Sequence, residues 1–252
     1  MKNPYIFGHR GAMGYEIENT MKSFERAIET GAGIETDLQL TRDNQIICIH
    51  DNVFNVNSKC YNVSKLPLKD IKKIKFEDNR TIPLLEDVFY NFRRKKKVLR
   101  YSFDIGDERV GMELIKLAIN HDILDNIEIT DTRIEVLTIL RNYNDKVKLI
   151  HTLPYEILVV KPEFISFKKL LALNIYALNL NIEQTIENAN LTQIIDNGLK
   201  CYVWDVNTEL WMIKILNWKY RGHFIESIYT NFPDELMIMR NRIFFQKELL
   251  LS

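Results

Sequence analysis

Short apolar runs alternate along the chain with longer segments in which apolar positions recur at helical spacing. The short runs are rich in β-branched and aromatic residues, which is typical of strands, and the longer segments are typical of helices that cover a parallel sheet. We predict strands at residues 5–9, 34–40, 99–105, 126–130, 148–151, 175–180, 200–206 and 227–230. We predict helices at residues 20–30, 84–94, 111–121, 133–143, 187–197 and 208–220.

Eight strands with helices between them predict an α/β fold, the (β/α)8 TIM barrel, with a doubly wound open sheet as the alternative. The chain has 252 residues, and a barrel of about 250 residues commonly forms one domain. We therefore expect a single domain over residues 1–252. Residues 51–83 interrupt the rhythm, because they are polar and basic with one short helical stretch near residues 68–75. This segment is expected to be a small insertion after the second strand.

The last predicted helix spans residues 235–251. Phe244, Phe245 and Leu249 give it an exposed apolar character. Two interpretations stay open: the helix closes the barrel, or it packs against a second copy of the chain in a homodimer.

Composition and charge narrow the class of protein. A hydrophobic content of 46% excludes a disordered chain. The 34 basic and 34 acidic side chains balance, which argues against a nucleic-acid partner bound through a broad positive surface. The one basic run, Arg93 to Lys97, is interpreted as a solvated helix end.

The cysteines and the N-terminal residues bear on where the protein works. Cys48, Cys60 and Cys201 lack CxxC spacing, so neither a disulfide framework nor a thiolate metal site is expected. No apolar leader follows Met1, and no run of about 18 apolar residues occurs. We therefore expect a cytoplasmic protein with no membrane span.

Candidate catalytic residues lie where the predicted strands end, which is where the active sites of parallel barrels are found. The first strand ends in His9 and Arg10. Glu35 and Asp37 are two positions apart, so the alternation of a strand places both carboxylates on one face. His50 ends a short extended run that follows.

On the third strand, alternation puts Ser102, Asp104 and Gly106 on one face. If Asp104 joins Glu35 and Asp37, the three carboxylates form a hard oxygen site for a divalent metal, Mg²⁺ or Ca²⁺, with Mn²⁺ also compatible. An Asp at a strand end is also a common cap of the next helix, which is the alternative role for Asp104. Two histidines beside such a site suit general acid and base chemistry, and an arginine can bind a phosphate.

Several short segments closely resemble the signature of the glycerophosphodiester phosphodiesterase family. They are His9-Arg10-Gly11, Glu18-Asn19-Thr20, Glu35-Thr36-Asp37 with Leu40-Thr41-Arg42-Asp43, His50-Asp51, Ile82-Pro83-Leu84-Leu85-Glu86, Val203-Trp204-Asp205-Val206-Asn207 and Tyr229-Thr230-Asn231-Phe232-Pro233. The resemblance implies a (β/α)8 barrel, a divalent metal, and hydrolysis of a small-molecule glycerophosphodiester to glycerol 3-phosphate and an alcohol.

The resemblance also implies roles for single residues. Glu35, Asp37 and Asp104 would be the metal ligands, and His9 and His50 the acid/base pair. Arg10 would contact the phosphate and Trp204 would form a wall against the glycerol or headgroup, with Glu18 and Asn19 in supporting positions. His151 is a weak further candidate, and His121 and His223 are expected at the surface.

The sequence departs from the family pattern at four positions. Gly106 stands where the family usually has a lysine, Asp104 where it has Glu, Ile17 where it has Pro, and Asn231 where it has Asp. Two alternative functions therefore stay open. One is a catalytically impaired barrel that binds phosphodiesters as a regulatory module, and the other is a related barrel enzyme that cleaves another phosphodiester or forms a cyclic phosphate.

Overall fold

Eight parallel strands form a closed barrel in the computed structural model, which describes residues 3–92, 99–186 and 188–249. They are β1 (Tyr5–Gly8), β2 (Gly33–Leu40), β6 (Tyr101–Ile105), β7 (Ile127–Asp131), β8 (Lys148–Thr152), β9 (Ala177–Asn181), β10 (Lys200–Trp204) and β11 (Ser227–Thr230). Pairing of β1 with both β2 and β11 closes the sheet. The predicted barrel is confirmed, and the open sheet is excluded because it would leave two unpaired edges.

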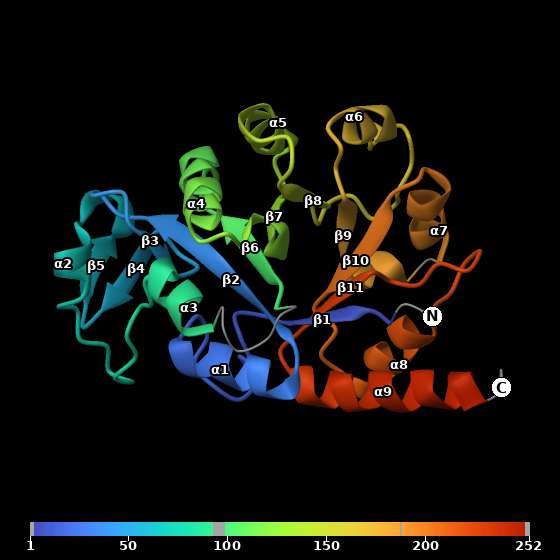
Figure 1. The fold of residues 1–252 in the computed structure, drawn as a ribbon, viewed down its shortest axis with the longest axis horizontal. Coiled ribbons are helices and arrows are strands. Elements are labelled where there is room, and N and C mark those ends of the chain that lie inside the picture. Colours follow the sequence, from blue (N-terminus) through green and yellow to red (C-terminus); the bar gives the residue numbers. More distant parts are fainter. Residues whose placement is uncertain (1–2, 93–98, 187, 250–252) are drawn as a thin grey trace.

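Helices surround the barrel, one after each of its strands (Figure 1). They are α1 (Met21–Thr30), α3 (Leu85–Phe92), α4 (Glu108–Asn120), α5 (Ile134–Tyr143), α6 (Phe167–Ala172), α7 (Asn188–Asp196), α8 (Glu209–Asn217) and α9 (Pro233–Leu249). Their apolar faces and the outer faces of the strands make one continuous core. Among the described residues, no helix combines the length and apolar character needed to cross a bilayer.

Two helices differ from the prediction. The sequence pattern did not predict α6, which is only six residues long and begins at the N-cap Ser166. The prediction that a helix begins at Gly111 is wrong, because α4 begins at Glu108 with Asp107 as its N-cap. Its first turn is polar, so apolar spacing alone did not reveal it.

The insertion packs beside the C-terminal end of β2 (Figure 1). It follows β3 (Ile46–Cys48), which pairs antiparallel with β2, and contains β4 (Val53–Val56), β5 (Lys59–Asn62) and the short α2 (Leu68–Ile71). The prediction of one helical stretch missed the β4–β5 hairpin. Its turn is made by Asn57 and Ser58, both at positive φ, as a two-residue type I′ turn requires.

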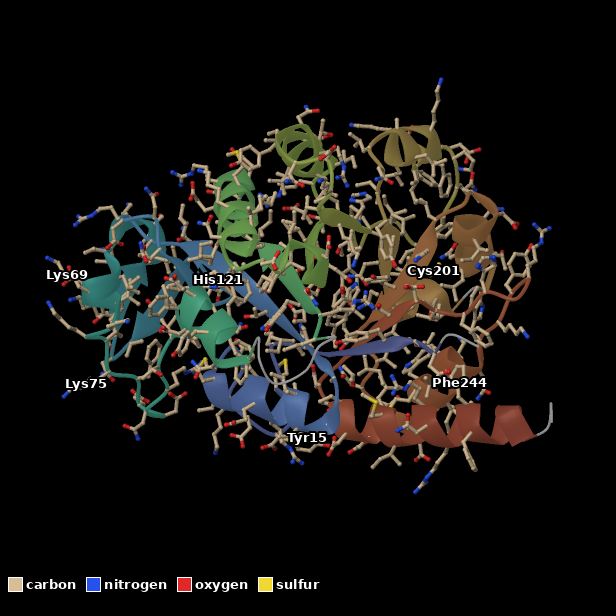
Figure 2. All side chains as sticks on the ribbon, viewed as in Figure 1. Tyr15, Lys69, Lys75, His121, Cys201 and Phe244 are labelled. Carbon is tan, nitrogen blue, oxygen red and sulfur yellow. The ribbon has the colours of Figure 1, made fainter. Side chains whose placement is uncertain are left out.

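Helix α9 packs against α1, α8 and β1 and thus closes the barrel, one of the two interpretations that the sequence left open (Figure 1). The prediction that Phe244 is exposed is wrong, because its ring is buried against Phe224. Phe245 is exposed, and the side chain of Leu249 lies outside the described residues. Figure 2 labels Phe244 on the inner side of this helix.

Other predictions concern polar side chains. His223 is exposed as expected, whereas His121 is half-buried against the Phe89 ring and 3.5 Å from Glu86, measured from Nε2 to Oε1. The Arg93 to Lys97 run lies outside the described residues. Inside the barrel, Arg100 pairs with the fully buried Glu128, and Tyr202 donates a hydrogen bond to the same carboxylate. This network and the rings of Phe7 and Tyr229 fill the interior below the pocket.

Candidate active site

A tight turn after β1 brings His9 and Arg10 to the mouth of the barrel. Arg10 and Gly11 adopt φ values of 49° and 81°. A Cβ on Gly11 would lie 2.4 Å from the Ser23 hydroxyl oxygen, so only glycine fits this close approach of the turn to α1. The carbonyl of Arg10 accepts hydrogen bonds from the Ser23 hydroxyl and the Asn19 backbone N–H. The turn is therefore fixed in position by α1 and by the loop before it.

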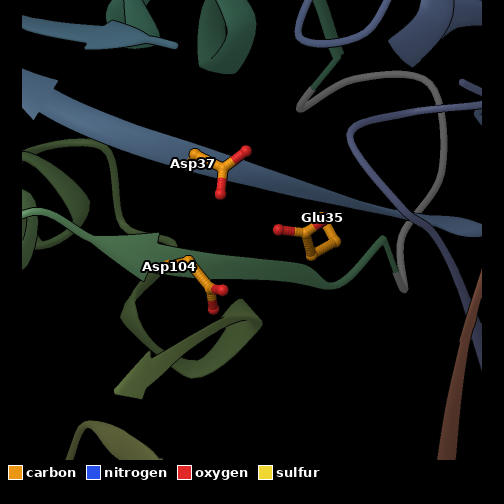
Figure 3. A group of neighbouring side chains, drawn as sticks. All are labelled: Glu35, Asp37 and Asp104. Atoms are coloured by element: carbon orange, nitrogen blue, oxygen red, sulfur yellow. The ribbon is translucent and has the colours of Figure 1, made fainter. Parts of the chain in front are cut away.

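Three carboxylates converge beside this turn (Figure 3). Glu35 and Asp37 share the inner face of β2, and Asp104 lies opposite Asp37 in the β2–β6 register. One oxygen from each lies within 4.8 Å of the other two. Asp104 is free for this cluster because Asp107 caps α4, accepting from the Arg109 and Val110 backbone N–H groups.

The electrostatics of the cluster favour a bound cation. Burial, and then the charges of Asp37 and Asp104, hold the pKa of Glu35 well above its usual range. The Asp104 side chain is exposed to the pocket but has protein on its other sides. The resulting loss of solvation, together with the charge of Asp37, raises its pKa to about 8. The Arg10 guanidinium offsets part of the negative charge of the cluster, because its Nε lies 3.1 Å from Asp37 Oδ2.

Both predicted histidines face the same pocket in different surroundings. His9 Nδ1 lies 2.9 Å from Asn231 Oδ1, an amide oxygen that can only accept, so Nδ1 carries the proton. The other ring nitrogen, Nε2, is then an acceptor and lies 4.0 Å from Glu35 Oε2. Burial lowers the pKa of His9, and the nearby Arg10 adds to this. His50 is exposed, with its Nδ1 2.8 Å from Asp51 Oδ1.

Glu18 and Asn19 hold the groups that face the pocket. Arg10 Nη1 donates to Glu18 Oε2 at 2.8 Å. The Asn19 amide nitrogen donates to Asp37 Oδ2 at 2.9 Å, and its oxygen accepts from the Thr36 hydroxyl at 2.5 Å. Because Asn19 is buried, these bonds fix the rotamer of Asp37. The structure thus places both residues next to the cluster.

The carboxylates, both histidines and Arg10 line one pocket of about 320 Å³ together with Trp204. The sequence did not reveal the remaining lining residues, which are Thr132, Thr152, Leu153, Tyr155, Asn179 and Tyr229. They lie in or just after β7, β8, β9 and β11, so inspection of every strand end would have found them. Two buried polar atoms here, Trp204 Nε1 and Asn179 Oδ1, have no hydrogen-bond partner among the described residues.

The position of Gly106 is closed by a neighbouring side chain. A Cβ on Gly106 would lie 2.4 Å from the Gln39 amide oxygen. The amide nitrogen of Gln39 donates to the His50 carbonyl at 2.9 Å. A neutral amide therefore lies where a longer side chain at residue 106 would begin. His151 is buried with its Nδ1 3.2 Å from the Asp131 carbonyl and does not line the pocket.

Comparison with known proteins identifies the family. The profile of the Glycerophosphoryl diester phosphodiesterase family matches residues 9–235. The chain belongs to this family. Its members are named for hydrolysis of glycerophosphodiesters, which makes the chain an enzyme of the phosphoric diester hydrolase class.

Relatives and solved structures agree with this assignment. YhdW of Bacillus subtilis, named as a candidate glycerophosphodiester phosphodiesterase, is 27% identical over 249 residues, covering 91% of this chain and 95% of YhdW. A candidate glycerophosphodiester phosphodiesterase from Galdieria sulphuraria superposes with a TM-score of 0.82 at 21% identity, covering 96% of this chain and all of that one. An Oleispira antarctica phosphodiesterase, solved with its product sn-glycerol-3-phosphate, gives a TM-score of 0.78 at 16% identity over 94% of this chain and 96% of its own.

Proposed function

We propose that the protein is a metal-dependent phosphodiesterase that hydrolyses glycerophosphodiesters to glycerol 3-phosphate and an alcohol. The observation that carries the proposal is the convergence of three carboxylates, two histidines and one arginine in a single pocket at the mouth of the barrel. The product complex of the Oleispira antarctica phosphodiesterase supports the substrate class.

The donor set of this pocket fits a hard divalent cation. Glu35, Asp37 and Asp104 supply only carboxylate oxygens, and two of them are buried together at a cost that a cation offsets. Mg²⁺, Ca²⁺ and Mn²⁺ all suit such ligands. When bound, the metal would polarise a phosphoryl oxygen and lower the pKa of a coordinated water or hydroxyl.

Different surroundings assign different tasks to the two histidines. His9 has a lowered pKa and a free Nε2 directed at the cluster, so it is neutral near pH 7 and suited to accept a proton from the nucleophile. His50 is exposed on the rim of the pocket beside Asp51 and is suited to donate a proton to the leaving alkoxide. Both transfers take place at nitrogen atoms that face one substrate.

The rest of the pocket binds and orients the diester. Arg10 is held by Glu18 and Asp37, and its guanidinium presents further N–H donors to a phosphate oxygen. Trp204 and Tyr155 meet edge to face at 5.6 Å between ring centroids and form an apolar wall opposite the carboxylates. This wall suits the carbon chain of a glycerol or headgroup.

Gly106 is the observation that favours a second candidate function. With a glycine there and the Gln39 amide against it, the pocket has one cation fewer than the family pattern implies. Loss of one preorganised charge can slow catalysis by about 10²- to 10³-fold. A barrel that binds phosphodiesters and turns them over slowly or not at all is therefore the alternative.

One experiment separates the two functions. Release of glycerol 3-phosphate is measured from a panel of water-soluble glycerophosphodiesters, with EDTA and after addition of Mg²⁺, Ca²⁺ or Mn²⁺. We expect metal-dependent release that His9→Asn abolishes and that His223→Asn, a change at an exposed histidine far from the pocket, leaves intact. Tight diester binding by the metal-loaded protein without any product would support the binding module instead.

A further inference from the structure

Exposed apolar side chains are distributed unequally between the two ends of the barrel. In the connections that follow the strands, large apolar side chains are exposed at Tyr15, Ile17, Val53, Tyr155, Leu158, Val159, Phe164 and Ile186. Among the described residues, no large apolar side chain is exposed in the connections that lead from helices back to strands. The exposed apolar surface of the loops therefore lies on the same end as the pocket, which we term the mouth face.

The loop between β8 and α6 holds the largest share of this surface. Leu158 is 61% exposed and Val159 is 41% exposed, and Tyr155 of the same loop packs against Trp204 in the pocket wall. This apolar loop is thus continuous with the active site. Neighbouring exposed apolar side chains that continue into the wall of a pocket are typical of a surface that contacts a ligand, a partner or a membrane.

Buried polar side chains hold the loop in this conformation. The Gln184 amide nitrogen donates to the carbonyls of Pro154 and Ile157, both at 2.9 Å. Asn190 donates to the Leu158 carbonyl at 2.8 Å and accepts from the Val160 backbone N–H at 2.9 Å. Gln184 and Asn190 are each only 1% exposed. The outward direction of Leu158 and Val159 is therefore built into the fold.

The insertion adds positive charge at the same end of the barrel. Residues 51–83 carry seven basic and four acidic side chains in a chain whose net charge is zero. Lys65, Lys69, Lys72, Lys73 and Lys75 are all exposed, and Figure 2 shows Lys69 and Lys75 pointing away from the barrel. Two hydrogen bonds attach the insertion at the C-terminal end of β2. The Arg42 backbone N–H donates to the Leu66 carbonyl, and the Leu68 backbone N–H donates to the Asp43 carboxylate.

We propose that the mouth face docks on the surface of an anionic lipid bilayer. Leu158 and Val159 enter the headgroup layer, and the insertion lysines lie over anionic headgroups. Exposed apolar side chains together with clustered lysines are the combination by which peripheral proteins bind anionic membranes. Docking in this orientation places the pocket opening against the layer in which phosphodiester headgroups lie. The inference goes beyond the proposed function and does not depend on it.

Vesicle co-sedimentation of the full chain tests the proposal. The vesicles are phosphatidylcholine alone, or phosphatidylcholine with 30% phosphatidylglycerol. We expect binding to the anionic vesicles that falls as salt rises. Leu158→Ser with Val159→Ser, and separately Lys69→Gln with Lys72→Gln and Lys75→Gln, should each weaken it by about 10-fold or more.

Matched controls lie away from the mouth face. Ile119→Ser with Ile139→Ser removes two exposed apolar side chains from the outer faces of α4 and α5. Lys116→Gln with Lys146→Gln and Lys219→Gln removes three exposed lysines from α4 and from connections that lead back to strands. These variants should bind vesicles like the wild type. Absence of binding to anionic vesicles, or equal losses in the controls, would overturn the proposal.

A second measurement on the same variants keeps docking and catalysis apart. Hydrolysis of a water-soluble glycerophosphodiester should be unchanged in the mouth-face variants, since none of these residues lines the pocket. An inactive protein that binds anionic vesicles would refute the proposed function and leave docking intact. An active protein that binds no vesicles would do the reverse.

Discussion

Replacement of Asn231 by Asp tests how the pocket sets the protonation of His9. Asn231 Oδ1 lies 2.9 Å from His9 Nδ1, and the Asn231 backbone is fixed by a bond from its N–H to Asn207 Oδ1 at 2.8 Å. The substitution keeps the shape of the side chain and its acceptor oxygen. It changes one property, because a negative charge replaces a neutral amide beside the imidazole.

The magnitude follows from this short contact. Two unit charges about 4 Å apart interact by about 4 kcal/mol at an effective dielectric constant near 20. His9 is partly open to the pocket, with 26% of its side chain exposed, which reduces the effect. A neighbouring opposite charge commonly moves a pKa by about 1 to 3. The new carboxylate favours the imidazolium, so the pKa of His9 rises. As the pH falls, His9 therefore becomes protonated, and stops acting as a base, at a higher pH than in the wild type.

The assay is the pH dependence of kcat/KM for a soluble glycerophosphodiester at saturating metal. The acid limb should move to higher pH by about 1 to 2 pH units. Asn142→Asp adds the same charge at an exposed position of α5 and should leave the limb in place. An Asn231→Asp enzyme with an unmoved acid limb and unchanged kcat/KM would refute the assignment of His9 as the base.

Three further predictions concern the metal site and the core. In the metal-free protein the pKa of Asp104 is about 8, so protons compete with the metal for this carboxylate and the affinity for Mn²⁺ should rise with pH up to about 8. A Mn²⁺ affinity that calorimetry finds constant from pH 6 to 8 would contradict this. Asn19→Ala removes the hydrogen bonds to Asp37 and Thr36, which should lower the free energy of unfolding, measured with urea, by about 1–3 kcal/mol and weaken metal binding. Unaltered metal binding would show that Asn19 does not orient Asp37. Phe24→Ala leaves a cavity at a fully buried site and should lower the free energy of unfolding by about 3–5 kcal/mol, whereas Phe245→Ala at an exposed site should lower it by less than about 0.5 kcal/mol. Equal losses would contradict the burial of Phe24 in the core.

The barrel could be predicted because each of its strands is a short buried run between turn residues. Alternation within β2 and β6 placed Glu35, Asp37 and Asp104 on inner faces before any contact was known. The register that sets Asp104 opposite Asp37 depends on how two strands pair, and alternation alone does not fix it. Spacing therefore indicated the members of the cluster, and the closed sheet determines their distances.

Other features depend on contacts that no sequence pattern contains. The conformation of the β8–α6 loop is set by Gln184 and Asn190, which lie some 30 residues further along the chain. The burial of Phe244 depends on Phe224 rather than on spacing within α9. The short α6 is held mainly by tertiary packing, because helices of this length have little stability of their own.

Metal binding and hydrolysis measured side by side on a single variant show whether the three carboxylates form a catalytic metal site. Asp104→Asn removes one carboxylate of the cluster, and Asp125→Asn makes the same change at an exposed residue at the opposite end of the barrel. Bound Mn²⁺ is counted by electron paramagnetic resonance, and release of glycerol 3-phosphate is followed in the same samples. We predict one tightly bound ion per chain in the wild type and in Asp125→Asn, and loss of both the ion and the activity in Asp104→Asn. An Asp104→Asn protein that keeps its ion and its rate would show that this cluster is not the catalytic metal site.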